Sequence, residues 1–291
     1  MNENLERVLA DGIVEEIVGR LKSGKEAEVW IVRHRGEDVA AKIYKDRAQR
    51  SFKNNADYLE GRKVRNSRTR RAIEKGSRFG RQAAEEAWKE AEANALFRLH
   101  DAGVRVPTPI LYYEGVLLME LVKGPEGGPA PRLVEARLSA EEAGELYADL
   151  RSQIVKMLCA DVIHGDLSPY NILLGERGPV IIDLPQTVDP AANPRASFFL
   201  QRDVDNVRTF LAGFDRSLHS RRYDARAIWK AWERRELTPD FVPPEPPPRA
   251  TPLESQSFRR RGRGGPVVVE VTRLPVGGPS FAAASRRSER R

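Results

Sequence analysis

The arrangement of apolar residues along the first part of the chain is typical of β-strands. Residues 27–32 and 39–44 place their apolar side chains alternately on two faces, which is the period of a strand. Short apolar runs at 110–113 and 116–121 predict two further strands, separated by a turn at Glu114-Gly115. The N-terminal half is therefore expected to contain a sheet.

Other stretches have the spacing of helices. Apolar residues recur every three or four positions over 81–100 and in the segment that ends near Cys159. The second segment begins with Ser139 and Glu142, which form the pattern of a capping box. Further helical patterns, the first of them weak, lie over 5–18, 197–212 and 224–236.

The stretch VIHGDLSPYNILLGERGPVIID, residues 162–183, combines a predicted hairpin with polar residues at its ends. The apolar runs at 172–174 and 180–182 predict a β-hairpin with a five-residue loop. A hairpin returns to where it began, so Asn171 before the first strand and Asp183 after the second are expected to lie side by side. Asp166 is one short loop away.

These three oxygen-bearing side chains indicate a cation site. Two carboxylates about 4 Å apart repel by roughly 4 kcal/mol at an effective dielectric of 20, and Mg²⁺ accepts such oxygens together with phosphates. The order His164-x-Asp166, Asn171, hairpin, Asp183 is that of a kinase catalytic loop and metal-binding loop. Asp166 would then deprotonate an acceptor hydroxyl, and Asn171 and Asp183 would bind Mg²⁺. The alternative is that each is an ordinary turn residue.

A lysine and a glutamate in apolar surroundings predict a buried ion pair. Lys42 shares a strand face with the small Ala40, which leaves room for a ligand. Glu92 lies within the apolar stripe of the helix over 81–100, where a carboxylate is costly unless it is paired. Lys42 on a neighbouring strand would supply that partner, whereas a solvated strand lysine is the simpler alternative.

Residues 19–26 contain most of a Walker A loop, but the reading fails on two counts. Glu26 stands where Ser or Thr should bind Mg²⁺, and the chain continues as a strand instead of a helix. We therefore expect a strand, turn and strand with Ser23, Gly24 and Lys25 at the tip, where backbone amides could cover phosphates.

Charge and composition narrow the class of protein. The chain has 291 residues and a net charge of +7, with ten Arg against four Glu over 241–291 and thirteen Lys and Arg against four acids over 45–81. The single cysteine, Cys159, is expected to be a core thiol in a reducing cytoplasm. No apolar run is long enough to cross a bilayer and the first residues lack a signal-peptide pattern, so no membrane partner is expected.

Taken together, these motifs resemble those of the RIO family of atypical protein kinases, of the RIO1 type and its bacterial-type members. They occur in the family's order from about residue 17 to 212, and their combination is far more specific than any one of them. HGDLSPYN carries Ser168 where ordinary kinases have Lys. The motifs are SGKEAEV (23–29), AAKIYK (40–45), WKEAEANALFRL (88–99), HGDLSPYN (164–171) and IIDLPQTVD (181–189).

The resemblance implies an α+β, two-lobed protein-kinase-like fold with a β-rich N-lobe and a small helical C-lobe that lacks an activation segment. It also implies a division of the chain into an N-terminal extension (1–20), the N-lobe (21–121) with a basic insertion (46–82), the C-lobe (122–236) and a disordered basic tail rich in Pro and Arg (237–291).

The resemblance further assigns the nucleotide site, with ATP and Mg²⁺ as cofactors. Asp166 and Asp183 are the implied catalytic residues, and Asn171 and Asp183 the implied metal ligands. Met119 would be the gatekeeper, followed by backbone groups that face adenine. The implied nucleotide-binding residues are Ser23, Gly24, Lys25, Glu26, Lys42, Glu92, Met119, Glu120, Leu121 and Ser168.

The implied activity is that of a serine/threonine protein kinase (EC 2.7.11.1), an ATPase, or both. The substrate would be a protein, including the chain itself, in ribosome small-subunit maturation. The basic insertion and tail would bind RNA or a ribosomal particle, unless they are solvated segments without a partner.

Two alternatives stay open at this point. Aminoglycoside and choline kinases share the H-G-D…N-I-L and I-D signature, but they need a larger helical lobe than the roughly fifty residues between Asp189 and the tail provide. An RNA-binding pseudokinase scaffold is the second alternative, and the presence of all the catalytic residues argues against it.

Overall fold

A computed structural model describes residues 3–24, 27–45 and 78–245. The chain divides into two compact units, 1–247 and 248–291, and all described residues belong to the first. Lys25, Glu26, most of the predicted basic insertion and the tail from residue 246 lie outside the described residues. The predicted lobe and tail boundaries therefore stay predictions.

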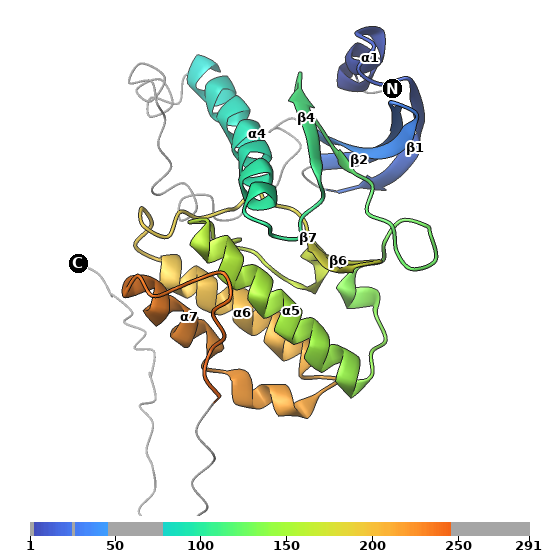
Figure 1. Ribbon diagram of the computed structural model, residues 1–291. Coiled ribbons are helices and arrows are strands. Elements are labelled where there is room, and N and C mark those ends of the chain that lie inside the picture. Colours follow the sequence, from blue (N-terminus) through green and yellow to red (C-terminus); the bar gives the residue numbers. More distant parts are fainter. Residues whose placement is uncertain (1–2, 25–26, 46–77, 246–291) are drawn as a thin grey trace, which may run out of the picture. The chain divides into compact units, whose positions relative to one another are not determined.

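A five-stranded antiparallel sheet in the order β1-β2-β3-β5-β4 forms the N-terminal part (Figure 1). The central strand β3 is hydrogen bonded to β2 along one edge and to β5 along the other, and its Ala40, Ala41 and Ile43 are buried. The strands are β1 (Glu16–Ser23), β2 (Ala27–His34), β3 (Glu37–Tyr44), β4 (Pro109–Tyr113) and β5 (Val116–Glu120).

Two helices flank this sheet. α1 (Glu3–Ala10) buries Leu5 and Val8 against one face, in a small core with Val32 and Leu118. α4 (Arg78–Asp101) contributes instead to the larger core, which also contains Leu117 of β5 and the C-terminal helices. The sheet is thus covered by α1 on one side and connected through α4 to the rest of the molecule (Figure 1).

The prediction of one helix over 5–18 was wrong beyond Ala10. Gly12 has φ +70°, a left-handed conformation that ends a helix, and β1 begins at Glu16. The chain then pairs with β2, with Glu16 opposite Arg33. The helical pattern over 5–18 is weak because this range spans the end of a helix and the start of a strand.

The C-terminal part is mostly helical, which confirms the predicted α+β class. The capping box of α5 is present, because Glu142 N donates to Ser139 Oγ at 3.2 Å and Ser139 N donates to Glu142 Oε2 at 2.8 Å. The elements are the 3₁₀ helices η2 (Leu133–Glu135), η3 (Pro169–Asn171) and η4 (Arg216–Arg221), the helices α5 (Ala140–Cys159), α6 (Ala196–Leu211) and α7 (Asp224–Glu233), and the strands β6 (Ile172–Gly175) and β7 (Gly178–Ile181).

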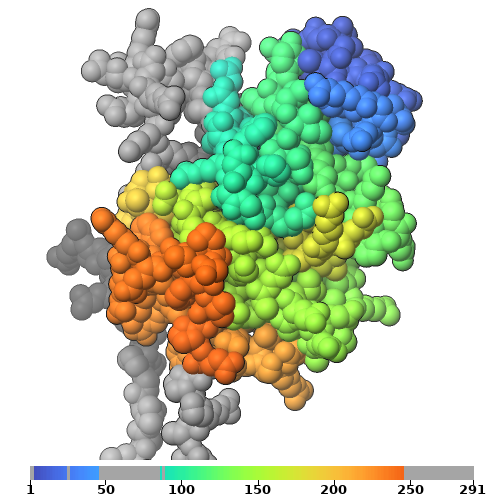
Figure 2. All heavy atoms as spheres, viewed as in Figure 1, coloured from blue at the N-terminus to red at the C-terminus, as the bar shows by residue number. Residues whose placement is uncertain are grey.

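The hairpin β6-β7 exists, but its predicted five-residue loop was too long. The strands continue to Gly175 and from Gly178, so only Glu176 and Arg177 connect them. Gly178 has φ +107°, which a non-glycine residue rarely adopts, and this allows the tighter turn. Figure 2 shows the hairpin in contact with α5.

The prediction that Cys159 is a core thiol was also wrong. Cys159 is the last residue of α5 and is exposed, while its neighbour Leu158 faces the core. A helical period places adjacent residues about 100° apart, so an apolar run at a helix end does not bury every member. In the described part of the chain, none of the helices combines the length and hydrophobicity needed to span a bilayer.

Candidate active site

The hairpin brings the three predicted oxygen-bearing residues to one place. Ile182 N donates to the Asn171 carbonyl at 3.0 Å, which closes the open end of the hairpin directly before Asp183. Asn171 Nδ2 donates to the Asp166 carbonyl at 3.0 Å. The side chains of Asp166 and Asp183 are 55% and 45% exposed, so both reach a surface that a ligand can contact.

Lys42 meets two carboxylates at this site. Its Nζ lies 2.5 Å from Glu92 Oε1 and 2.9 Å from Asp183 Oδ1. Leu184 N also donates to Glu92 Oε1, at 3.3 Å. Glu92 therefore connects strand β3, helix α4 and the segment after β7. The buried Tyr44 ring lies 5.6 Å from the ammonium group and completes the apolar side of the pair.

The charges of this group stabilise one another. Burial by itself would lower the pKa of Lys42, but the carboxylates of Asp183 and Glu92 outweigh it and raise the pKa above its ordinary value. The Lys42 ammonium in turn lowers the pKa of Asp183, against the opposing effect of burial. Lys42 is thus protonated and Asp183 ionised near neutral pH.

The backbone at Asp183 aims its carboxylate. Asp183 has φ +68°, in the left-handed region that Asp and Asn adopt more readily than other non-glycine residues. Gly165 has φ +81° on the neighbouring loop, where a side chain would be strained. Both irregular positions lie beside the candidate catalytic residues, as is common in active sites.

Helix α6 holds the loop that carries Asp166. The buried carboxylate of Asp203 accepts hydrogen bonds from Gly165 N at 2.8 Å and Leu167 N at 2.9 Å. Asn206 Nδ2 donates to the Leu167 carbonyl at 2.9 Å, and Arg202 Nη2 donates to the Gly165 carbonyl. Both peptide groups around Asp166 are therefore fixed by one helix.

The sequence reasoning did not identify Asp203 or Arg202. A signal for Asp203 was present, because it falls on the apolar stripe of α6 as Glu92 does on that of α4. Arg202 had no such signal. Burial raises the pKa of Asp203 to about 6, although the two backbone donors favour its charged form.

Two features of the surroundings of Asp166 shift its pKa in opposite directions. Partial burial raises its pKa, while the positive charge of Arg202 opposes this shift. Arg202 Nη2 lies 4.0 Å from Asp166 Oδ1. Arg202 therefore contacts both the backbone and the carboxylate of the candidate catalytic loop.

His164 is a structural brace, as predicted. Asp166 N lies 3.3 Å from His164 Nδ1, which must accept this hydrogen bond. His164 Nε2 lies 3.1 Å from the Ile182 carbonyl and must donate to it. The two contacts connect the candidate catalytic loop to the end of β7.

Of the three residues predicted at the tip between β1 and β2, Ser23 and Gly24 are described. Lys45 Nζ donates to Ser23 Oγ at 3.1 Å and to the Gly24 carbonyl at 2.8 Å. Ser23 Oγ donates to Glu28 Oε1 at 3.2 Å. These contacts shape the tip, and its role in phosphate binding stays a prediction.

The segment predicted to face adenine has its own internal bonds. Glu120 N donates to the Thr108 carbonyl at 2.8 Å, and its carboxylate accepts from Thr108 N at 3.0 Å and pairs with Arg105 at 3.3 Å. Glu120 thus stabilises the end of β5. Met119 is half-buried in the same strand, and Leu121 follows it. Ser168 is half-buried and its carbonyl accepts from Asn171 N at 2.9 Å.

The donor set at Asn171 and Asp183 fits Mg²⁺. Magnesium takes one or two protein oxygens and completes its coordination with water and phosphate. Among the described residues, no group of three or more His, Cys, Asp or Glu side chains could hold a metal.

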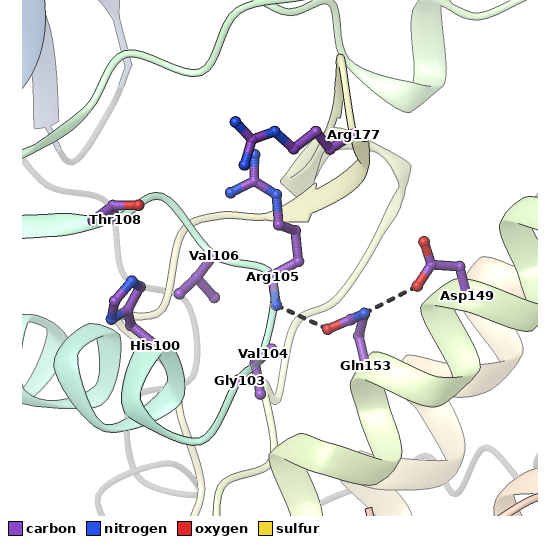
Figure 3. Close-up of a pocket in the computed structure, with 9 residues that line it drawn as sticks. All are labelled: His100, Gly103, Val104, Arg105, Val106, Thr108, Asp149, Gln153 and Arg177. Carbon is purple, nitrogen blue, oxygen red and sulfur yellow. Dashed lines mark hydrogen bonds between the residues drawn. The ribbon is translucent and has the colours of Figure 1, made fainter. Parts of the chain in front are cut away.

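A polar pocket of about 450 Å³ lies where the α4-β4 connection faces α5 and the hairpin turn (Figure 3). Gln153 accepts from Arg105 N at 2.8 Å and donates to Asp149 at 2.9 Å, so its floor is internally hydrogen bonded. The lining residues are His100, Gly103, Val104, Arg105, Val106, Thr108, Asp149, Gln153 and Arg177.

Comparison with known proteins supports the resemblance. The family model RIO1, described as the RIO domain, matches residues 28–237. The RIO-type serine/threonine-protein kinase Rio1 of Haloferax volcanii is 37% identical over 205 residues, 70% of this chain and 66% of that protein. The Homo sapiens serine/threonine-protein kinase RIO1 is 35% identical over 206 residues, 70% of this chain and 34% of that protein.

A solved structure shows the same fold. The Rio2 kinase from Chaetomium thermophilum, in a complex with ADP, Mg²⁺ and phosphoaspartate, aligns with a TM-score of 0.52 at 23% identity, over 72% of this chain and 59% of that one. The matched region corresponds to just under two thirds of the archaeal relative and about a third of the human one. With its motifs, fold and site geometry in agreement, the chain belongs to the RIO1 family of RIO-domain proteins.

Proposed function

We propose that the chain is a Mg²⁺- and ATP-dependent serine/threonine protein kinase that also hydrolyses ATP. The observation that carries the proposal is the contact of Lys42 with both Glu92 and Asp183, beside Asp166 and Asn171. Membership of the RIO1 family favours this function over a small-molecule phosphotransferase or a scaffold without activity.

Each residue has a role that follows from its chemistry. An ammonium group has three donors, and Lys42 uses two of them on Glu92 and Asp183, which leaves one for a phosphate oxygen. Asn171 and Asp183 would hold Mg²⁺, which offsets the charge that develops on the transferred phosphate. Asp166 would accept the proton of the acceptor hydroxyl, in a loop that α6 keeps in position.

The finer parts of the proposal concern substrates and place of action. We include an ATPase activity, a protein substrate such as the chain itself, a cytoplasmic location and a partner that is RNA or a ribosomal particle in small-subunit maturation. The basic composition of residues 45–81 and 241–291 supports the RNA partner through its attraction to phosphates.

Transfer from γ-labelled ATP tests the activity. The purified chain is incubated with Mg²⁺ and labelled ATP, and label is followed into protein, RNA, small alcohols and free phosphate. We expect protein and phosphate to be labelled, with at least a 100-fold loss in Asp166→Asn because the proton acceptor is removed. Asp161→Asn, on the exposed turn after α5, is the matched control. Equal label transfer in the wild type and in Asp166→Asn would refute the proposal.

A further inference from the structure

The pocket of Figure 3 contains charged side chains to which the proposed function gives no role. Its volume of about 450 Å³ lies within the range of roughly 300–1,000 Å³ that is usual for small-molecule sites. Its lining comes from the end of α4, the α4-β4 connection, α5 and the hairpin turn. None of the residues predicted to bind nucleotide or metal, or to act in catalysis, belongs to that lining. Its own residues must therefore indicate what it binds.

Two basic residues of the lining already have a carboxylate beside them. Arg105 Nη1 and Nη2 bond to the Glu120 carboxylate at 3.4 Å and 3.3 Å, and Arg105 N donates to Gln153 Oε1 at 2.8 Å. His100 Nδ1 lies 3.8 Å from Asp101 Oδ1. Arg105 therefore belongs to the wall of the pocket, and no ligand is needed to balance its charge.

Arg177 is the cation of the lining that has no counter-charge. It lies in the two-residue turn between β6 and β7 and is exposed. Within the described part of the chain, its side chain makes no hydrogen bond, ion pair or ring contact. Figure 3 shows this side chain pointing toward Arg105 and away from Asp149. A guanidinium presents its N–H donors in a planar fork that matches an acid group, so Arg177 offers the pocket a site for an anion.

Asp149 is the anion of the lining that has no counter-charge. Its Oδ1 accepts from the neutral amide of Gln153 at 2.9 Å, and no cationic side chain of the described residues pairs with it. Gln153 is only 7% exposed, so it holds the carboxylate in place. A Cβ at Gly178 would lie 3.1 Å from Asp149 Oδ2, which places that oxygen at the hairpin turn. Asp149 therefore offers the pocket a fixed acceptor for a cation.

The two unbalanced charges have opposite sign and belong to different elements, the hairpin turn and α5. A ligand with a single charge would satisfy one of them and leave the other without a partner. Charges attract more strongly in a recess than on an open surface, because less water surrounds them. The apolar side chains of the lining are Val104 and Val106, which suit a short hydrocarbon chain.

We propose that the pocket binds a small zwitterion of the amino-acid class. Its amino group bonds to Asp149, its acid group bonds to Arg177, and a short aliphatic chain joins the two beside the valines. The inference goes beyond the proposed kinase function and does not depend on it, because neither charged residue takes part in phosphate transfer.

Binding of simple compounds tests the pocket without any nucleotide. Glycine, 4-aminobutyrate and 5-aminopentanoate are each compared with the carboxylate and the amine of the same chain length, by ligand-observed NMR titration at constant ionic strength. We expect at least one zwitterion to bind about fivefold or more tightly than both of its singly charged analogues, which is the contribution of one further ion pair. If no zwitterion binds, or if none binds more tightly than its analogues, the proposal is overturned.

Two variants assign each end of the zwitterion to one residue. Arg177→Gln should weaken the zwitterion and the carboxylate and leave the amine unchanged, whereas Asp149→Asn should weaken the zwitterion and the amine and leave the carboxylate unchanged. Asparagine keeps an oxygen for Gln153, and urea denaturation checks that both variants fold. The matched controls, which should bind as the wild type does, are the exposed Arg137→Gln and, on the exposed face of α5, Glu145→Gln.

Two further outcomes identify which claim fails. If Arg177 pairs with Asp149 in solution, Arg177→Gln would bind the amine more tightly than the wild type does, and the proposal is wrong. If the zwitterion binds with the expected dependence on both residues but no label passes from ATP to protein, the pocket stands and the proposed kinase function fails. Label transfer without zwitterion binding has the opposite meaning.

Discussion

At the scale of single residues, the chemistry of the site follows from one cation, Lys42, that faces two carboxylates. Glu92 is only 3% exposed and belongs to a helix, so its position is fixed, while Asp183 belongs to a loop and is half-exposed. The buried Glu92 positions the lysine, and the half-exposed Asp183 is the better placed to exchange the lysine for the proposed metal. Removing either should therefore have different consequences.

The first prediction concerns Glu92→Gln. Breaking a buried ion pair usually costs 3–5 kcal/mol, but Asp183 still compensates Lys42, so we expect a smaller loss of unfolding free energy in urea. Nucleotide turnover should fall by about 100-fold, because Lys42 is then held only by Asp183 and is displaced from the phosphates. Glu90→Gln, on the exposed face of α4, is the control. Wild-type turnover in Glu92→Gln would show that Glu92 does not position Lys42.

The second prediction concerns the pH dependence of stability through Asp203. Its pKa is about 6 in the folded chain against an ordinary value of 3.8, so the folded state binds more protons than the unfolded state between these values. The contribution of Asp203 therefore stabilises the fold at low pH and is lost as the pH rises through about 6. The corresponding free energy is on the order of 3 kcal/mol.

Denaturation of Asp203→Asn between pH 4 and 7 measures this contribution. The difference in unfolding free energy between wild type and Asp203→Asn should shift in favour of the variant as the pH rises. Asp205→Asn, on the same helix and half-exposed, is the control for loss of a carboxylate from α6. Parallel stability curves for wild type and Asp203→Asn would contradict the raised pKa.

At the scale of elements, α6 acts as the support of the candidate catalytic loop. Arg202, Asp203 and Asn206 occur within little more than one helical turn and form hydrogen bonds with Gly165 and Leu167, the residues on either side of Asp166. Because a packed helix is more rigid than a loop, this support fixes the position of Asp166.

The third prediction follows from this support. Arg202 lowers the pKa of Asp166, so Arg202→Gln should raise that pKa and move the acid limb of the pH profile of kcat/KM toward higher pH. Initial rates of γ-phosphate transfer over pH 4.5–8.5 measure the shift. Arg226→Gln serves as the control, since it lies on another helix. If the acid limb stays at its wild-type pH, Arg202 does not influence the pKa of Asp166.

The elements also show which predictions from sequence patterns are reliable and which are not. The strand over 39–44, the capped helix α5 and the hairpin were predicted because each is determined by residues close together in the chain. The single helix over 5–18 failed because Gly12 and the pairing of β1 with β2 override a weak local pattern. The hairpin loop was placed too long because its length depends on φ +107° at Gly178.

At the scale of the whole molecule, the site joins the sheet, α4, the hairpin and α6. Lys42 comes from β3, Glu92 from α4 and Asp183 from the end of the hairpin, so a ligand that contacts all three connects separate elements of the fold. Any molecule that binds the folded state alone must stabilise it. Nucleotide binding should therefore be visible as thermal stabilisation.

The fourth prediction uses that stabilisation. Mg²⁺ with an ATP analogue at 100 times its Kd should stabilise the chain by about 2.7 kcal/mol, which raises Tm by roughly 5–10 °C. Asp183→Asn should lose the part that depends on Mg²⁺ and keep the part due to the nucleotide alone. Asparagine tolerates the φ of +68° at this position, so the variant is expected to fold. If Mg²⁺ raised Tm as much in Asp183→Asn as in the wild type, Asp183 would not be a metal ligand.

The sequence by itself determined the local groupings and their chemistry. Asn171 and Asp183 are adjacent because a hairpin returns to its origin, and Glu92 needed a cation because it interrupts an apolar stripe. Tertiary structure alone decided the contact of Lys42 with Asp183, 141 residues away, and the support of Asp166 by α6. Such contacts depend on how whole elements pack and on burial, which no pattern of neighbouring residues specifies, and the pKa of about 6 at Asp203 has the same origin.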